Sequence, residues 1–328
     1  MKYALLFFVC FVMLLSCGSD DSDDSEMLKD GSANDSNLVN ESLADSLFVL
    51  APVLLENQWG YIDKSGNVII TPTFEQARFF SEGLAAVKVN NKWGFTNKKG
   101  FASIAPQFDN ALWLSEGLAP VEIDGLWGYI DKTGALIISQ QFVSAFPFSD
   151  GLARVDIGNG NGKWGYINRN GTFVIAPQFA GALSFSEGLA PVKVEGQNSN
   201  DKWGFVDEAG NMLIPQQFEV VSQFSEGLAV AVKDNRRGYI DKSANIVITI
   251  RFSENRDFSE RLAAVANNNR WGYIDDIGRM VISFRFDEVD VFSKGLAAVS
   301  IEDVWGYIDK SGSFVIRRQF ERAGKFGN

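Results

Sequence analysis

The side chains best suited to acid–base chemistry are carboxylates that recur at one place along the chain. They are Asp63, Asp131, Asp207, Asp241, Asp275 and Asp309. Paired carboxylates would serve as general acid and base in a hydrolase. Asn97 and Asn168 take the same place in two further copies, and an amide cannot act as a base. Because Asp and Asn both cap turns through the side-chain oxygen, we interpret the series as turn caps.

A second acidic series precedes a glycine at another turn. Its members are Glu82, Glu116, Asp150, Glu187, Glu226 and Glu260, with Lys294 in a further copy. A position that accepts a lysine is unsuited to a catalytic carboxylate, so we interpret these residues as solvated turn residues.

The chain contains no histidine, and its only cysteines are Cys10 and Cys17. This composition excludes Ser-His-Asp and Cys-His catalysis and the usual zinc sites. The Gly- and Asn-rich run 156–162 lacks the alternating acids and the later Glu of a calcium loop. We therefore expect no enzymatic activity, no cofactor and no metal site.

These residues are positioned by a repeat. Trp-Gly occurs seven times, at steps of 34 to 39 residues apart from one of 68, and Arg237-Gly238 lies midway in that long step. The tryptophans are Trp59, Trp93, Trp127, Trp164, Trp203, Trp271 and Trp305. A fixed period of this length indicates a repeat architecture, here of eight copies.

Each copy is expected to be an antiparallel β-meander of about 34 residues, with short strands separated by turn residues. Residues 84–89 form the first strand, the Trp-Gly segment forms the second, and a continuously apolar third strand such as 68–70 is expected to be covered on both sides. The remaining piece, residues 72–83, fits either a fourth short strand or an irregular loop. Its conformation stays open.

The tryptophans have two possible roles. A residue that recurs at one strand position in every unit is suited to packing unit against unit, and a row of ligand-stacking indoles is the alternative. The glycine after each Trp would let the indole of a neighbouring element approach the backbone closely. We favour the packing role.

The pattern KWGYIDKSGNVIIxPxF…FSEGLAAV over residues 50–328 resembles the WG repeat family, which occurs mostly in bacterial proteins and has largely unassigned activity. The resemblance implies a β-rich repeat scaffold and brings no catalytic residues. The last copy lacks the Gly-Leu-Ala-Ala-Val strand, whereas residues 50–55 supply one before the first Trp-Gly. An N-terminal strand that completes the last blade would remove exposed sheet edges. We therefore expect an all-β, closed propeller-like toroid, with an open β-solenoid as the alternative.

The N-terminal segment has the features of a lipoprotein leader. Residues 1–16 combine Lys2 with a short apolar core, and Leu14-Leu15-Ser16-Cys17 resembles a bacterial lipobox. We expect the signal peptide to be removed and Cys17 to carry lipid, which anchors the protein to the membrane. Residues 17–46 are expected to form a disordered acidic tether, followed by the repeat domain at 47–328.

The tether carries most of the net charge of −11, because residues 18–46 contain nine acidic residues and one basic residue. An acidic run behind a lipidated cysteine resembles a surface-export signal of Gram-negative lineages. We expect the protein at the outer membrane, exposed on the cell surface. The nearly balanced repeat region offers no charge pattern for nucleic acid.

Departures from the repeat are the candidate recognition residues, because packing does not require them. Two loops of adjacent copies are enlarged, and they contribute Asn159, Asn161, Gln197, Asn198 and Asn200. The sixth copy contributes Arg236, Arg237, Arg251, Arg256 and Arg261, a possible basic patch or a decayed repeat. We expect a noncatalytic scaffold that binds an envelope or extracellular protein or peptide through a rim, with carbohydrate binding as the alternative.

Overall fold

The fold was analysed in a computed structural model, which describes residues 49–158, 163–194, 202–250 and 252–328. The segments 1–16 and 17–46 assigned to signal and tether, Cys17 included, therefore lie wholly outside the described residues, as do Arg251, Asn159, Asn161, Gln197, Asn198 and Asn200. The described residues form strands and turns without a helix. Accordingly, no helix in this part of the chain is long and apolar enough to cross a membrane.

The repeat region consists of eight antiparallel sheets of four strands each. In the sheet that we name blade A, β4 (Gln76–Ala77), β5 (Leu84–Val89), β6 (Lys92–Asn97) and β7 (Ala102–Phe108) follow one another in space as in sequence. The chain makes this meander because turns with glycine or asparagine at positive φ separate short apolar runs. Blade A therefore has one inner strand, β4, two middle strands, β5 and β6, and one outer strand, β7.

Six further blades repeat this order. Blades B to D contain β8 (Asn110–Ala111), β9 (Leu118–Ile123), β10 (Leu126–Asp131) and β11 (Leu136–Phe142); β12 (Ser144–Ala145), β13 (Ala153–Asp156), β14 (Trp164–Ile167) and β15 (Phe173–Phe179); and β16 (Gly181–Ala182), β17 (Ala190–Lys193), β18 (Trp203–Val206) and β19 (Met212–Phe218). Blades E to G contain β20 (Val220–Val221), β21 (Ala229–Lys233), β22 (Arg236–Ile240) and β23 (Ile246–Ile250); β24 (Glu254–Ser259), β25 (Leu262–Asn267), β26 (Arg270–Asp275) and β27 (Met280–Phe286); and β28 (Glu288–Val289), β29 (Ala297–Ile301), β30 (Val304–Ile308) and β31 (Phe314–Phe320).

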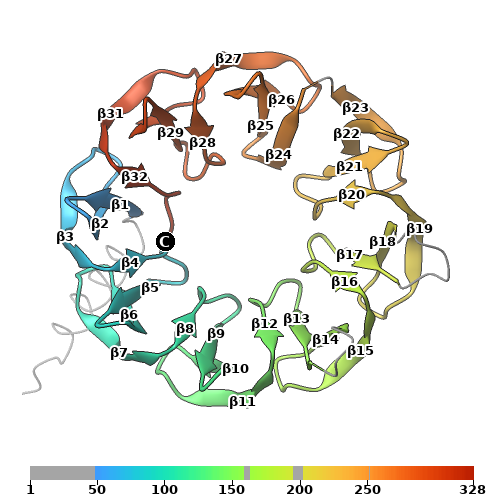
Figure 1. Cartoon of the computed structure of the whole chain (residues 1–328), viewed down its shortest axis with the longest axis horizontal. Helices are drawn as coiled ribbons and strands as arrows, with labels where there is room; N and C mark the ends of the chain where they lie inside the picture. Colours follow the sequence, from blue (N-terminus) through green and yellow to red (C-terminus); the bar gives the residue numbers. More distant parts are fainter. Residues whose placement is uncertain (1–48, 159–162, 195–201, 251) are drawn as a thin grey trace, which may run out of the picture. The chain divides into compact units, whose positions relative to one another are not determined.

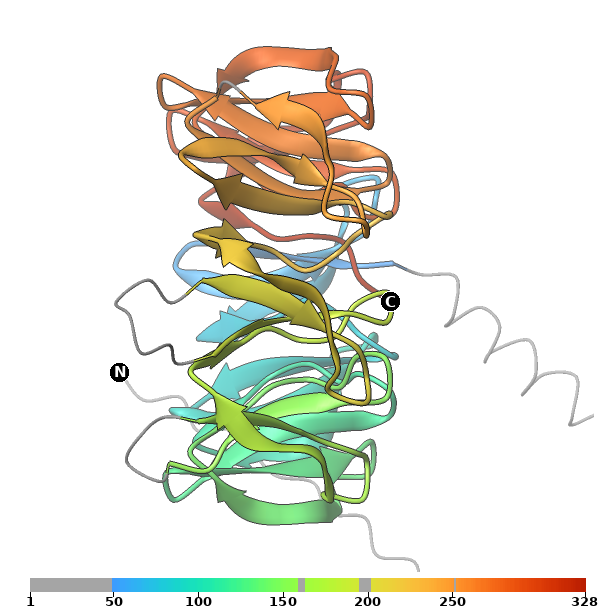
Figure 2. The same ribbon diagram turned by 90° about the vertical axis from the view of Figure 1, so that its right-hand side faces the viewer.

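The eighth sheet, blade H, combines both ends of the repeat region. Its inner strand β32 (Arg322–Ala323) pairs with β1 (Ala51–Leu55), which continues into β2 (Gln58–Ile62) and β3 (Val68–Phe74). Figure 1 shows the blades in a closed ring, with the short inner strands around the axis and the outer strands at the periphery. Seen from the side, the ring is a flat disc one blade thick (Figure 2). The closed eight-bladed propeller is therefore confirmed, and the open solenoid is excluded.

The segment whose conformation the sequence left open is the inner strand. It contains two residues in seven blades, and in blade F it extends to six in β24. It begins a new blade, although it follows the third strand of the repeat directly in sequence. Each sequence repeat therefore contributes to two blades.

Two predictions about the second and third strands were wrong. A Cβ atom on Gly94 would lie 2.5 Å from the carbonyl oxygen of Ile104, so the outer strand, and not an indole, approaches this glycine. The register between the two strands shifts here as in a β-bulge, which brings their backbones together. The outer strand is also not covered on both sides: Val68 and Ile69 are 49% and 43% exposed, whereas Ile70 is 6% exposed. An edge strand on the circumference has only one neighbouring blade face to pack against.

The hydrophobic core is divided among the eight seams between blades. At the seam between blades B and C, Trp127 packs with Tyr129, Phe142 and Phe148. The Tyr129 hydroxyl also donates to the carbonyl of Phe146 at 2.9 Å, so the hydroxyl of this buried side chain has a hydrogen-bond partner. The Trp-Gly tryptophans of the other blades occupy the same kind of seam.

Candidate binding site on the inner face of the ring

Two neighbouring positions follow the two-residue inner strand in seven blades and lie within β24 in blade F; one of them is constant and the other varies. The constant position is buried and apolar in every blade, as Phe80, Leu114, Phe148, Phe185, Phe224, Phe258, Phe292 and Phe326. The residue before it differs in every blade, as Phe79, Trp113, Pro147, Ser184, Gln223, Asp257, Val291 and Lys325. Packing requires the first series and leaves the second free to vary, so the second series is the better candidate for recognition.

Two aromatic members of this variable series contact each other. The ring centroids of Phe79 and Trp113 lie 5.2 Å apart at an interplanar angle of 42°, and both side chains are half-buried. The Nζ atom of Lys325 lies 4.1 Å from the centroid of Phe79, a cation–π contact. Burial lowers the pKa of Lys325, and the Asp290 carboxylate partly offsets this effect. The three residues form an aromatic cluster with a cation at one end.

A hollow lies on each side of the aromatic pair. The first has a volume of about 340 Å³ and is lined by Trp59, Arg78, Phe79, Asp290 and Lys325 among others. The second has the same volume, and its lining includes Trp113, Phe146, Arg154, Ser184 and Gln223. Apolar walls with a few polar groups are typical of ligand pockets.

Each hollow contains an arginine that reaches toward the next blade. The Nε atom of Arg78 donates to the Ala111 carbonyl at 2.8 Å, and its guanidinium lies 4.9 Å from the Trp93 ring. Arg154 donates through Nη1 to the equivalent carbonyl, that of Ala182, and stacks on Phe146 at 3.6 Å. Burial lowers the pKa of both arginines.

The second acidic series forms a belt that joins the blades at one end of the ring. The Glu82 carboxylate of blade A accepts the N–H of Gly117 in blade B at 3.1 Å, and Lys132 of blade B lies 3.1 Å from the same carboxylate. Equivalent bonds run from Gly151 to Glu116, Gly188 to Asp150, Gly227 to Glu187, Arg261 to Glu226 and Gly295 to Glu260. These carboxylates are turn residues, as predicted, and each also bonds to the following blade, which the sequence did not reveal.

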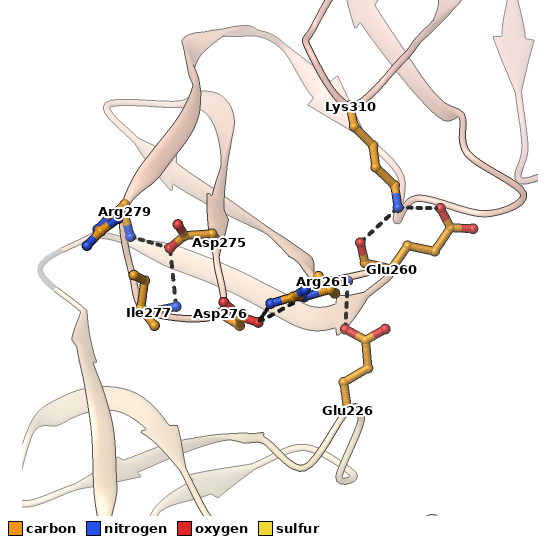
Figure 3. A network of polar contacts seen from close by, with 8 residues as sticks. All are labelled: Glu226, Glu260, Arg261, Asp275, Asp276, Ile277, Arg279 and Lys310. Atoms are coloured by element: carbon orange, nitrogen blue, oxygen red, sulfur yellow. Dashed lines mark hydrogen bonds and ion pairs between the residues drawn. The ribbon is translucent and has the colours of Figure 1, made fainter.

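Figure 3 shows how blade F departs from this belt. Arg261 replaces the usual glycine, and Asp276 replaces the usual lysine or arginine of the Asp turn. The Arg261 guanidinium donates to Asp276 at 2.8 and 3.1 Å, while its backbone N–H donates to Glu226 at 2.8 Å. The two departures therefore compensate each other's charge within the blade.

The structure does not bring the candidate arginines together. Arg236 lies beside the hairpin turn between β21 and β22, at the opposite end of the ring from Arg261. Arg237 donates to Asn255 of blade F at 2.9 Å, which places it in the seam where the other blades have tryptophan. Arg256 lies 5.0 Å from the Trp271 ring, on the other face of blade F.

The two enlarged loops connect equivalent strands of neighbouring blades. The first joins β13 to β14 in blade C, and the second joins β17 to β18 in blade D. The strand ends that flank them therefore lie at the same end of the ring. The candidate residues within them lie outside the described part of the chain.

The first acidic series caps turns. Asp131 accepts the backbone N–H groups of Thr133 and Ala135 at 2.8 and 3.0 Å, and Asn97 and Asn168 accept the equivalent pairs. This confirms the interpretation drawn from the interchange of Asp and Asn. Among the described residues, no group of three or more acidic or thiol side chains is arranged to hold a metal ion.

Sequence reasoning missed Phe79, Trp113, Lys325 and Arg154. Trp113 is the only one of the eight tryptophans that no glycine follows. Arg154 stands where other copies have a small or apolar residue. An alignment of the eight copies would have exposed both departures, but not their position on the inner face.

Comparisons with known proteins agree with this fold. The sequence model of a family described as "WG containing repeat" matches residues 59–93, 93–127, 127–160, 164–197, 203–236, 238–271, 271–305 and 305–328. No curated protein matches the sequence.

Several solved structures resemble the chain, including the two that follow. A structure described as that of the eukaryotic initiation factor has a TM-score of 0.56 and 12% identity, over 85% of this chain and 97% of that one. Hsv2p of Kluyveromyces lactis has a TM-score of 0.50 and 10% identity, over 76% of this chain and 98% of that one. Identities this low support a shared fold and nothing more.

Proposed function

The chain belongs to the WG containing repeat family, and we propose that it is a noncatalytic propeller that binds a protein or peptide on the inner face of its ring. The observation that carries this proposal is the contact of Phe79 with Trp113 between two hollows, at a position that packing leaves free to vary. Aromatic and arginine side chains in partly desolvated pockets are the residues that most often dominate protein binding.

The shape of the aromatic cluster favours a peptide over a sugar. The rings of Phe79 and Trp113 are tilted by 42° and half-buried, and Arg78 and Arg154 line the hollows beside them. A tilted pair with recesses on both sides suits separate side chains of an extended segment. Carbohydrate binding remains the second candidate, because the same half-exposed rings would stack on sugar faces.

Affinity capture from envelope extracts tests the binding site. We expect Trp113→Ser to lose the captured partner, and the variant should fold because blade D has Ser184 at the same position. The matched control is Phe101→Ala, since Phe101 is an aromatic residue on the outside of blade A with 67% exposure. Equal capture by both variants and the unchanged protein would contradict the site, and capture of glycans from a panel would favour the second candidate.

The second part of the proposal concerns location. The lipobox-like Leu14-Leu15-Ser16-Cys17 and the acidic run behind it support a lipid anchor at Cys17 on the outer membrane of a Gram-negative bacterium, with the propeller at the cell surface. Cys17→Ser should abolish incorporation of a palmitate analogue and move the protein out of the membrane fraction. Protease treatment of intact cells should then digest the repeat region of the unchanged protein, and full protection would contradict surface exposure.

A further inference from the structure

Arg154 occupies a position that is small or apolar in every other blade. It lies on β13 opposite Tyr166, and the residues opposite the equivalent Tyr or Phe are Pro52, Ala86, Pro120, Pro191, Val230, Ala264 and Ala298. Packing of the propeller therefore does not require an arginine at this place.

Among the residues that the structure describes, none supplies a counter-charge to Arg154. Its guanidinium stacks on Phe146 and lies 5.3 Å from the Trp164 ring, and Nη1 donates to the Ala182 carbonyl. Nε is buried and has no hydrogen-bond partner. Within the described ranges no carboxylate forms an ion pair with this side chain. A partly buried charge is costly unless an opposite charge or hydrogen bonds satisfy it.

The hollow beside Arg154 offers space and further polar groups. It has a volume of about 340 Å³, and the residues that line it include Ser149, Ser184 and Trp113. Gln223 also lines it, and its side-chain amide is held by a bond to the Ser184 carbonyl at 2.8 Å. One guanidinium balances the single charge of a carboxylate, whereas a phosphate dianion would need a second cation.

We propose that Arg154 binds a carboxylate of the peptide partner in the hollow beside Trp113. This inference rests on the proposed function, because it concerns the same inner face. The carboxylate belongs either to an Asp or Glu side chain or to a peptide C-terminus, since both present the same two oxygens to the guanidinium fork.

Three acetylated pentapeptides, Leu-Gly-X-Gly-Leu, test the inference by titration of the purified protein. The first has Glu in the middle and an amidated end, the second has Gln and a free C-terminal carboxylate, and the third has Gln and an amidated end. Binding is followed through the Arg154 Nε and Trp113 indole signals in nitrogen–proton correlation spectra. We expect at least one charged peptide to bind about tenfold more tightly than the neutral one.

The test variants are Arg154→Ala and Arg154→Lys. Alanine is the residue of blades A, F and G at this position, so the first variant should fold, and its melting temperature checks this. We expect it to lose the preference for charged peptides, and the lysine variant to lose most of it, because an ammonium lacks the planar fork. Arg317→Ala, an exposed change on the outer strand β31, should keep the preference.

The outcomes separate this inference from the proposed function. A preference for charged peptides that survives Arg154→Ala would overturn the inference, as would binding of free glucuronate without binding of any peptide. If Trp113→Ser loses the captured partner and Arg154→Ala retains it, the result supports the proposed binding face and contradicts the carboxylate site at Arg154. If neither change affects capture of the partner, both the proposed binding face and the carboxylate site are contradicted.

Discussion

Leu50 and Gly327 exchange two backbone hydrogen bonds, from the Leu50 N–H to the Gly327 carbonyl at 3.0 Å and from the Gly327 N–H to the Leu50 carbonyl at 2.9 Å. The contact extends the pairing of β32 with β1 by which the two ends of the repeat region build one blade. The side chains of Leu50 and Phe326 are buried there. The ring is thus closed by backbone bonds, and its edges are not left open to other chains.

The closure should be sensitive to a side chain at Gly327. A Cβ atom at this position would overlap the carbonyl oxygen of Phe80 in blade A. We expect Gly327→Ala to lower the free energy of unfolding by roughly 2–4 kcal/mol, because backbone atoms cannot move aside cheaply. Chemical unfolding followed by tryptophan fluorescence measures the change. The control is Asn328→Ala at the exposed neighbouring position, and equal stability of the two variants would count against backbone closure.

The glycine of Trp-Gly should be intolerant of any side chain for a local reason. A Cβ atom on Gly94 would lie 2.5 Å from the Ile104 carbonyl and 2.7 Å from the Pro106 nitrogen. We expect Gly94→Ala to cost roughly 2–4 kcal/mol of unfolding free energy. Ser103→Ala, an exposed change on the adjacent outer strand, should stay within about 0.5 kcal/mol of the unchanged protein. A harmless Gly94→Ala would refute the close approach of the two strands.

Arg261 and Asp276 should behave as a compensated pair. Asp276→Lys alone places two cations side by side in blade F, so we expect a lower melting temperature. The double variant Arg261→Gly and Asp276→Lys restores the arrangement of blade B, in which Lys132 pairs with Glu82, and should recover the loss. About 1 M salt, where the screening length is roughly 3 Å, should shrink the difference. Additive effects of the two changes would show that the pair is not coupled.

The turn cap Asp131 should affect stability mainly in acid. The Thr133 hydroxyl and the backbone N–H groups of Thr133 and Ala135 lower the pKa of Asp131. Its stabilisation is therefore present above the unfolded-state pKa of about 3.9 and is lost as the pH falls through the lower folded-state pKa. Asp131→Asn should leave stability at neutral pH nearly unchanged and reduce the loss below about pH 4.

The reciprocal change in blade C is the control for this pH effect. Asn168→Asp introduces a titrating carboxylate into an equivalent turn, where the backbone N–H groups of Asn170 and Thr172 now donate to the amide oxygen. It should make the protein more sensitive to acid, as measured by urea unfolding at pH 7 and pH 3. Identical acid sensitivity of the unchanged protein and both variants would contradict the role of the carboxylate charge.

Features that depend on a few neighbouring residues could be predicted from the sequence. The Asp turns are one example, because Asp131 bonds to amides two and four residues further along the chain. The eight copies and the meander are another, because each strand is marked by its own turn residues. Closure of the ring was predicted from the order of strands at the two ends, and the pairing of β1 with β32 confirms it.

Features that arise between copies could not be predicted in this way. The two-residue inner strands are too short to show a period, so the sequence did not reveal that they begin the next blade. Glu82 and Gly117 are 35 residues apart, and a pattern within one copy cannot show that their atoms meet.

The sequence by itself determined the repeating unit, its turns, the all-β class and the absence of histidine chemistry, because these follow from residue types and short-range hydrogen bonds. Only the tertiary structure decided which variable residues share a surface. Phe79, Trp113 and Arg154 come from three successive blades, and they lie around one pair of hollows because the closed ring brings the inner parts of successive blades together around its axis. Their meeting depends on the angle between blades, which no single copy of the repeat encodes.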